Sequence, residues 1–297
     1  MPLYSQIIQY ILSGITIGSV YAITAIGFNI IYNSTSIINF AQGEFVMLGG
    51  LVMIFFTVTL KLPIILGFIL TILVLTLVGI VMERFAIFPI KNPSVITLII
   101  VTIAVSILLK GIAMFIWGKD AHVLPPFSGE KGINFIGASL NPQYIWVVGI
   151  SLVVVVFLSL FFKHTIVGKA MTACAVNRTA ASLMGINVRR MVLLSFVLSA
   201  AIGGIAGIII SPITLMAYDN GAMLGLKGFG AAVLGGLGNF YGAILAGFLL
   251  GVIESLGAGL IHSGYKDAIA LLVLLLVLFI KPSGIFGVAG IDQVKKF

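Results

Sequence analysis

Residues 144–162 read YIWVVGISLVVVVFLSLFF, a stretch without a single charged side chain. A transmembrane helix needs about 20 mainly apolar residues to span about 30 Å of hydrocarbon, and this stretch approaches that length. A membrane β-barrel would instead show strict alternation of apolar and polar residues in segments of roughly ten. The stretch does not alternate, so it predicts a membrane-spanning helix.

The whole chain has the composition that such helices imply. Hydrophobic residues make up 61% of the 297 and charged residues only 8%, and the mean hydropathy is +1.27. A water-soluble domain carries about 25% charged residues. We therefore predict an all-α, polytopic helical membrane protein, one transmembrane domain over residues 1–297 with about 8–9 hydrophobic spans. The apolar stretches fall at about 6–31, 37–60, 62–82, 94–117, 143–162, 191–216, 222–257 and 267–281.

The stretch 222–257 is too long for one ordinary span and is rich in glycine. We expect it to be broken near GGLGNFYG (235–242) and either to cross the membrane twice or to enter it twice as half-helices. Irregular backbone survives at membrane depth only where protein or a watery cavity satisfies its polar groups. Gly236, Gly238 and Asn239 are therefore candidate residues of a solute pathway or gate.

Basic residues in short loops predict the orientation in the membrane. Loop 163–190 carries five lysines and arginines and no acidic residue, so we expect it to be cytoplasmic. Loop 118–142 balances its charges and should face the outside, and counting back through the spans puts the N-terminus outside as well. The lysines of the C-terminal tail favour the cytoplasm, which requires 222–257 to enter the membrane twice.

Composition and motifs exclude several other functions. The formal net charge of +8 follows from lysine and arginine in cytoplasmic loops, so we expect no nucleic-acid partner. The single cysteine, Cys174, excludes an internal disulfide and a cysteine-cluster metal site, and the three histidines lack metal-ligand spacing. There is no P-loop and no Ser-His-Asp arrangement. We expect no catalytic residue, no metal and no cofactor on this chain. The N-terminus lacks a basic region, so we also expect no cleavable signal peptide.

Polar residues interrupt the second apolar stretch, in SIINFAQGEFVMLGGL (36–51). A carboxylate such as Glu44 costs about 2–3 kcal/mol to insert in a span. It could lie in the first turn of a helix, where the dipole favours it, pair with a polar neighbour, or line a transport pathway. The topology places it near the cytoplasmic end of the second span, which favours a helix start or a gate. Candidate pathway or gate residues here are Asn39, Gln42, Gly43 and Glu44.

The basic loop contains AVNRTAASLMGI (175–186), a short stretch that can form a helix and that Gly185 can end. Leu183, Met184 and Ile186 would lie on one exposed side of it. A short amphipathic helix without a core of its own is suited to docking on a partner. If transport is active, its energy comes from such a partner subunit or from an ion gradient.

Three longer blocks carry a resemblance to a known family. They are GITIGSVYAITAIGFNIIYNSTSIINFAQGEFVMLGG (14–50), AVNRTAASLMGINVRRMVLLSFVLSAAIGGIAG (175–207) and GFGAAVLGGLGNFYGAILAGFLLGVIES (228–255), followed by KPSGIFG (281–287). In this order and spacing the chain resembles the branched-chain amino acid ABC transporter permease family. Members of that family are the membrane subunits of binding-protein-dependent importers. The resemblance covers nearly the whole chain.

The resemblance implies a role for the basic loop. Importer permeases dock their ATPase through a loop with an EAA-x3-G pattern, and here Thr179-Ala180-Ala181 precedes Gly185 at that spacing. Thr179 departs from the glutamate of the pattern. The residues implied to couple to the ATPase are Arg178, Thr179, Ala180, Ala181, Leu183, Met184, Gly185 and Ile186.

The resemblance also implies partners and a place in the cell. The expected partners are two cytoplasmic ABC ATPase subunits that use ATP and Mg²⁺, a second homologous permease and an extracytoplasmic solute-binding protein. The expected location is the inner (plasma) membrane of a prokaryote. The implied mechanism is alternating access, and the chain itself would not be an enzyme.

The solute and the driving force stay open at this stage. Relatives that look like this chain move leucine, isoleucine and valine, other amino acids, or urea and short amides. A proton-coupled secondary carrier with Glu44 or Glu254 as a relay is a rival hypothesis. A passive channel for urea-like solutes is another.

Overall fold

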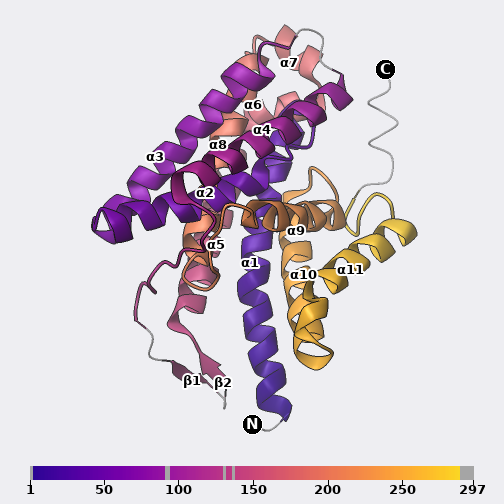
Figure 1. The fold of residues 1–297 in the computed structure, drawn as a ribbon. Coiled ribbons are helices and arrows are strands. Elements are labelled where there is room, and N and C mark those ends of the chain that lie inside the picture. Colours follow the sequence, from indigo (N-terminus) through magenta and orange to yellow (C-terminus); the bar gives the residue numbers. More distant parts are fainter. Residues whose placement is uncertain (1–2, 91–93, 130–131, 136–137, 288–297) are drawn as a thin grey trace.

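Eight helices in the described part of the chain are long and apolar enough to cross a bilayer. The computed structural model describes residues 3–90, 94–129, 132–135 and 138–287. It confirms the predicted polytopic helical architecture (Figure 1). These eight are α1 (Leu3–Thr35), α2 (Gln42–Ile54) continued by η1 (Phe55–Thr59), α3 (Ile64–Met82) continued by η2 (Glu83–Ile87), α4 (Val95–Trp117), α5 (Pro142–His164), α8 (Val188–Ile210), α10 (Phe240–Leu260), and α11 (Lys266–Ile280) preceded by η3 (Ser263–Tyr265).

Helix α1 lies at the centre of the bundle, and α10 packs against it backbone to backbone. A Cβ placed on Gly18 would lie 2.8 Å from Phe248 Cα, and one on Gly251 would lie 2.4 Å from Gly18 Cα. Small residues permit this close contact. In lipid, where no hydrophobic effect drives helices together, the close van der Waals packing of the two backbones stabilises the pair. The two helices run antiparallel, since residues late in α10 face residues early in α1.

The structure confirms that the stretch 222–257 is broken. Helix α9 (Asn220–Gly235) ends where predicted, and α10 begins after a short connection in which Gly236 and Gly238 both have a φ of +89°. Such a backbone strongly favours glycine because a side chain there is strained.

Two asparagines of α1 hold this connection. Asn29 Oδ1 accepts from Gly238 N at 3.0 Å and Asn29 Nδ2 donates to Asn239 O at 3.1 Å. Asn33 Nδ2 donates to Gly238 O at 3.1 Å. Buried backbone groups need such partners because unpaired ones cost free energy. Sequence analysis did not identify Asn29 or Asn33.

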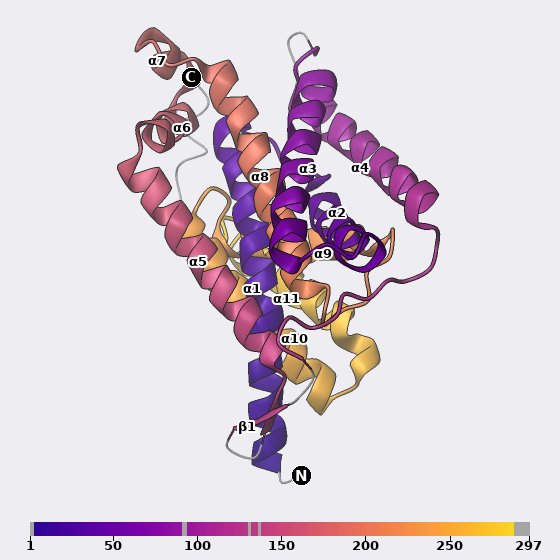
Figure 2. The same ribbon diagram turned by 90° about the vertical axis from the view of Figure 1, so that its left-hand side faces the viewer.

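Helices α2 and α9 lie across the long axis of α1 rather than along it (Figures 1 and 2). Helix α9 has 16 residues, which corresponds to a length of about 24 Å at 1.5 Å per residue. It is not among the eight helices long enough to span a bilayer. The two crossing helices meet in the interior, and their contact positions the candidate site.

The bundle has two different ends. Helices α6 (Ile166–Val176) and α7 (Arg178–Leu183) lie at one end, and the N-terminal end of α1 lies at the other (Figures 1 and 2). At the same end of the bundle as the N-terminus lies a β-hairpin that was not predicted from the sequence (Figure 1). It pairs β1 (Ile133–Phe135) with β2 (Ala138–Leu140). The loops predicted to face opposite sides of the membrane thus lie at opposite ends.

Candidate functional site

Gln42 ties three helices together at the start of α2. Its Nε2 donates to Ser199 O at 3.2 Å, and its Oε1 accepts from Ser199 Oγ, which also lies 2.9 Å from Gly27 O. Gln42 is fully buried. Both ends of the amide are therefore used in holding α2 against α1 and α8.

Asn39 and Gly43 also belong to the packed interior. Asn39 Oδ1 accepts from Ala41 N at 3.1 Å and supports the turn before α2. Asn39 Nδ2 is buried and has no hydrogen-bond partner among the described residues. Gly43 lies directly against α9, because a Cβ there would lie 2.0 Å from Gly221 O and 2.7 Å from Gly225 Cα. Only glycine permits α2 and α9 to cross at this distance.

Glu44 is a buried carboxylate in the first turn of α2, with 1% of its surface exposed. Its Oε1 accepts from Ser106 Oγ at 2.9 Å. Its Oε2 has no hydrogen-bond partner among the described residues and lies against Gly221. The N-terminal dipole of α2 favours a negative charge at this position. A buried carboxylate with one oxygen unpaired is a costly arrangement and marks a candidate functional residue.

Glu44 lies in the first turn of the second span, Gln42–Thr59, as one of the expected alternatives had it, but this turn lies deep in the bundle. Its partner Ser106 is the central residue of α4, Val95–Trp117. Gln42, two residues before it, packs on Gly27, eight residues and about 12 Å before the end of α1. Residues 36–41 are irregular and lead the chain back into the bundle before α2 begins.

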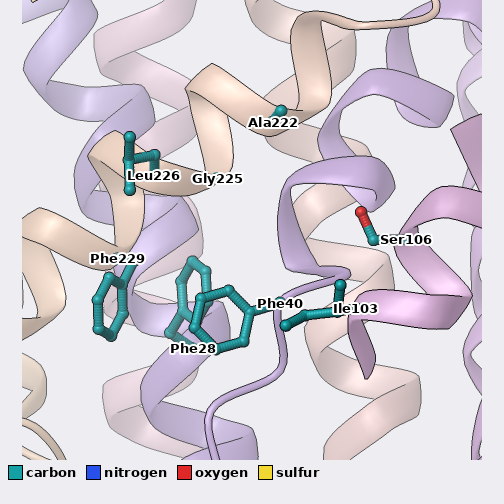
Figure 3. Close-up of a pocket in the computed structure, with 8 residues that line it drawn as sticks. All are labelled: Phe28, Phe40, Ile103, Ser106, Ala222, Gly225, Leu226 and Phe229. Carbon is teal, nitrogen blue, oxygen red and sulfur yellow. The ribbon is translucent and has the colours of Figure 1, made fainter. Parts of the chain in front are cut away.

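A pocket of about 240 Å³ lies beside this carboxylate (Figure 3). Figure 3 shows the rings of Phe28, Phe40 and Phe229 grouped on one side and Ser106 on the other. The centroid of the Phe229 ring lies 5.7 Å from that of Phe28 and 5.9 Å from that of Phe40. Ser106 both lines the pocket and donates to Glu44, so the carboxylate lies one hydrogen bond behind an apolar wall. The remaining lining residues are Ile103, Ala222, Gly225 and Leu226.

Gly236, Gly238 and Asn239 lie apart from this pocket. They form the connection between α9 and α10, and Asn239 Oδ1 accepts from Gly242 N at 3.0 Å as the cap of α10. Asn239 Nδ2 donates to Phe286 O at 3.1 Å. Their role in a gate stays a prediction, whereas their contacts hold α1, α9 and α10 together.

Helix α7 has the capped form that its sequence predicts. Asn177 Oδ1 accepts from Ala180 N at 2.9 Å at its start. At its end Gly185 has a φ of +83°, and Ile186 N donates to Ala181 O at 3.0 Å. A glycine in the left-handed conformation with such a bond is a common way to end a helix. The structure therefore confirms a short helix ended by Gly185.

The exposed face of α7 is narrower than expected. Leu183 is 85% and Met184 83% exposed, while Ile186 is half-buried and Ala181 is buried. Arg178, Thr179 and Ala180 are also exposed. Two large apolar side chains thus project from the end of the bundle.

Arg178 joins α7 to α1. Its guanidinium donates from Nε at 2.9 Å, and also from Nη2, to the main-chain carbonyl of Ser34. The residue is exposed as a whole, but its guanidinium is partly desolvated against α1, which lowers the pKa of Arg178 from its ordinary value, and nearby Cys174 opposes this in part. An arginine stays protonated despite such a shift, so the contact remains charge-assisted.

An ion-pair cluster around the buried pair Lys227 and Glu254 is the main feature not predicted from the sequence. Lys227 Nζ of α9 lies 2.8 Å from Glu254 Oε1 of α10 and 2.6 Å from Asp267 Oδ1 of α11. Tyr21 OH donates to Glu254, 3.0 Å from Oε2. Lys266 Nζ lies 3.4 Å from Glu254 Oε1. Sequence analysis considered only Glu254, as the relay of a rival carrier.

No group of three or more His, Cys, Asp and Glu side chains within the described ranges is placed to hold a metal ion.

Comparison with known proteins assigns a family. Residues 10–278 match the family model described as "Branched-chain amino acid transport system / permease component". The chain is 34% identical to the "High-affinity branched-chain amino acid transport system permease protein LivH" of Salmonella typhimurium, over 97% of each chain. It is 32% identical to the corresponding protein BraD of Pseudomonas aeruginosa, over 99% of this chain and 100% of that one.

Among solved structures, the chain is similar to one described as "PsaBC from Streptococcus pneumoniae in complex with Fab". The two are 17% identical, the match covers 95% of this chain and 92% of the other, and the TM-score is 0.46.

Proposed function

The chain belongs to the family of branched-chain amino acid transport system permease components, and we propose that it is the membrane subunit of an ABC importer for branched-chain or related amino acids. In this proposal it works in the inner membrane of a prokaryote, with its N-terminus outside and residues 163–190 in the cytoplasm. It binds no cofactor itself, and ATP with Mg²⁺ is used by its partners.

The observation that carries the proposal is the construction of α7. Leu183 and Met184 expose their side chains almost fully at one end of the bundle. Exposed apolar side chains grouped together mark sites of protein contact. The helix is capped at both ends and bonded to α1 through Arg178. It therefore offers an ATPase a defined surface with a rigid link to a spanning helix.

The contacts of α7 suggest how ATP binding drives transport. A displacement of α7 would act on Ser34 through Arg178. The irregular residues 36–41 follow at once, with a left-handed Ser36 (φ +57°), and lead to α2 and Glu44. If the ATPases move α7 as they close, the motion passes through these residues to the crossing of α2 and α9. That crossing lies beside the pocket lined by Phe28, Phe40 and Phe229, called the aromatic pocket below, so the motion can open the pocket alternately to either side. A small shift of α7 can produce a large movement of the interior helices, because packed helices switch between two discrete arrangements rather than deforming gradually.

The proposal includes further partners. A second homologous permease completes the pathway, two ATPase subunits bind the cytoplasmic ends, and a solute-binding protein delivers the solute from outside. The same chain could instead be a permease of this family for urea or short amides. The relatives' names, which specify branched-chain amino acids, favour amino acids.

The test is accumulation of labelled solutes by the reconstituted complex. The chain, its partner permease, its ATPases and its binding protein are placed in liposomes that contain ATP. We expect leucine, isoleucine or valine to accumulate, and liposomes without ATP to accumulate none. Accumulation of urea or acetamide in place of the amino acids would establish the alternative solute class.

A further inference from the structure

A second pocket, of about 320 Å³, lies on the other face of α9. Ala222, Gly225, Leu226 and Phe229 line the aromatic pocket. Asn220, Met223, Leu224 and Lys227 line the second one. These two sets have helical spacing and differ by two positions, which places them on nearly opposite sides of the helix. Helix α9 therefore separates the two pockets.

The wall of the second pocket has an apolar part and a charged part. Ile17, Val20, Ile210, Met223 and Leu224 form the apolar part. Lys227, Lys266, Asp219, Asn220, Tyr21 and Thr214 form the polar part. Ile17, Val20 and Tyr21 lie near the middle of α1, so this charge is held halfway along the central helix. Ionisable groups at such a depth are expensive and typically mark a solute or ion pathway.

Two of the charged residues are accessible to a solute: Asp219, whose side chain has no partner among the described residues, and Lys266, which is held only by a long ion pair to Glu254. The side chain of Asp219 is exposed and makes no hydrogen bond or ion pair within the described part of the chain. Lys266 is 40% exposed, and its contact to Glu254 is the longest in the cluster at 3.4 Å. By contrast, Glu254 is fully buried and Lys227 is 7% exposed, so this inner pair fixes α9 against α10.

We infer that the second pocket selects zwitterionic solutes, with Asp219 receiving the ammonium and Lys266 the carboxylate of an α-amino acid whose apolar side chain contacts α1 and α8. This inference rests on the proposed function and names the residues that decide its solute class. A neutral amide offers no charge to either residue, leaves Asp219 unpaired and gives Lys266 no carboxylate beyond Glu254. A site built for polar groups rejects analogues that lack them for this reason. The pocket thus separates amino acids from the urea-like solutes.

The inference is tested by placing a cysteine in the pocket and measuring whether a bound solute protects it from chemical labelling. Cys174→Ser removes the single native thiol, and Met223→Cys places one on the pocket wall at a position that is 42% exposed in methionine. The assembled complex is labelled with a membrane-impermeant maleimide in the presence of leucine, 4-methylpentanoate, 3-methylbutylamine or acetamide. Val123→Cys, on an exposed loop residue outside the pocket, is the control.

We expect leucine to slow labelling of Met223→Cys several-fold, the two singly charged analogues to slow it less, and acetamide to leave it unchanged. Asp219→Asn should reduce leucine protection to that of 4-methylpentanoate, and Lys266→Gln should reduce it to that of 3-methylbutylamine. If Asp219 and Lys266 only stabilised the fold, each substitution would not lower leucine protection to the level of the one analogue that lacks the corresponding charge. Equal protection by acetamide, or none by leucine, would overturn the inference.

Uptake provides a second measurement that does not depend on the cysteine variant. Asp219→Asn should lower ATP-driven leucine uptake about tenfold, as expected for a lost charged interaction, and Asp120→Asn on the outer loop should not. Unchanged uptake in Asp219→Asn would overturn the inference while leaving the importer intact. Loss of ATP dependence in the unsubstituted complex would instead refute the proposed function.

Discussion

The guanidinium of Arg178, in α7, donates two hydrogen bonds to the main-chain carbonyl of Ser34, one residue before the end of α1. This contact joins the helix that projects from the bundle to the helix at its centre. The residues after Ser34 lead directly to the crossing of α2 and α9. A contact at one end of the protein is thereby connected with the interior pocket.

Arg178→Ala should reduce the coupling of transport to ATP hydrolysis. Hydrogen bonds from a charged group contribute about 1.5–3 kcal/mol, so we expect at least about a tenfold fall in solute moved per ATP hydrolysed. ATPase subunits should still co-purify, because Leu183 and Met184 are unchanged. The measurement is the ratio of uptake to phosphate release in liposomes, with Arg190→Ala as the control at another exposed arginine. An unaltered ratio in Arg178→Ala would contradict this role.

Leu183→Glu should abolish capture of the ATPase subunits. Leu183 is 85% exposed, so the substitution removes no internal packing and should leave folding unchanged within about 0.5 kcal/mol. A charge at the centre of an apolar contact is costly because it is desolvated. The amount of ATPase that co-purifies with the permease is the measurement. Val176→Glu, 78% exposed on α6, is the matched control and should retain the ATPase.

Glu44→Gln should preserve assembly and lower the rate of uptake. The glutamine carbonyl can still accept from Ser106, and the substitution removes a buried charge with an unpaired oxygen. Stability should therefore hold or rise. Uptake should fall because the carboxylate behind the aromatic pocket is lost. Glu83→Gln, another buried carboxylate with an unpaired oxygen, is the control, and equal uptake in both variants would make Glu44 a structural residue only.

Lys227→Met should strongly destabilise the protein, because it leaves Glu254 buried without its closest cation. Removing one partner of a buried pair costs about 3–5 kcal/mol, whereas replacing both costs much less. The double variant Lys227→Met, Glu254→Gln should thus recover much of the lost free energy of unfolding. Asp267→Asn, at a half-exposed position, should cost under about 1 kcal/mol. Denaturant unfolding in detergent measures all three, and equal losses in the single and double variants would contradict this account.

Local patterns in the sequence predicted much of the fold. The long apolar stretches identify the spans, and the glycines around residue 236 identify the break between α9 and α10. Gly185 identifies the end of α7. Each of these depends on residues that are close together in the chain, where the length of a stretch or a backbone conformation is decided by composition.

Features that depend on packing could not be predicted. Residues 36–41 lead the chain back into the bundle and place Glu44 against Ser106, in the middle of α4, and no local pattern predicts this depth. Lys227 and Glu254 are 27 residues apart, and their contact exists only because α9 crosses beside α10. Asn29 likewise finds its partner at Gly238, 209 residues away. A single sequence contains no signal for such pairs except their unusual polarity within apolar surroundings.

The driving force of transport tests the central claim most directly. Liposomes that carry the assembled complex and external binding protein are supplied with internal ATP, with a pH gradient, or with neither, and labelled leucine is followed over time. We predict saturable accumulation that requires internal ATP and that persists when a protonophore removes the pH gradient. Uptake driven by a pH gradient in liposomes with this chain alone, or unsaturable flux without ATP, would contradict the account.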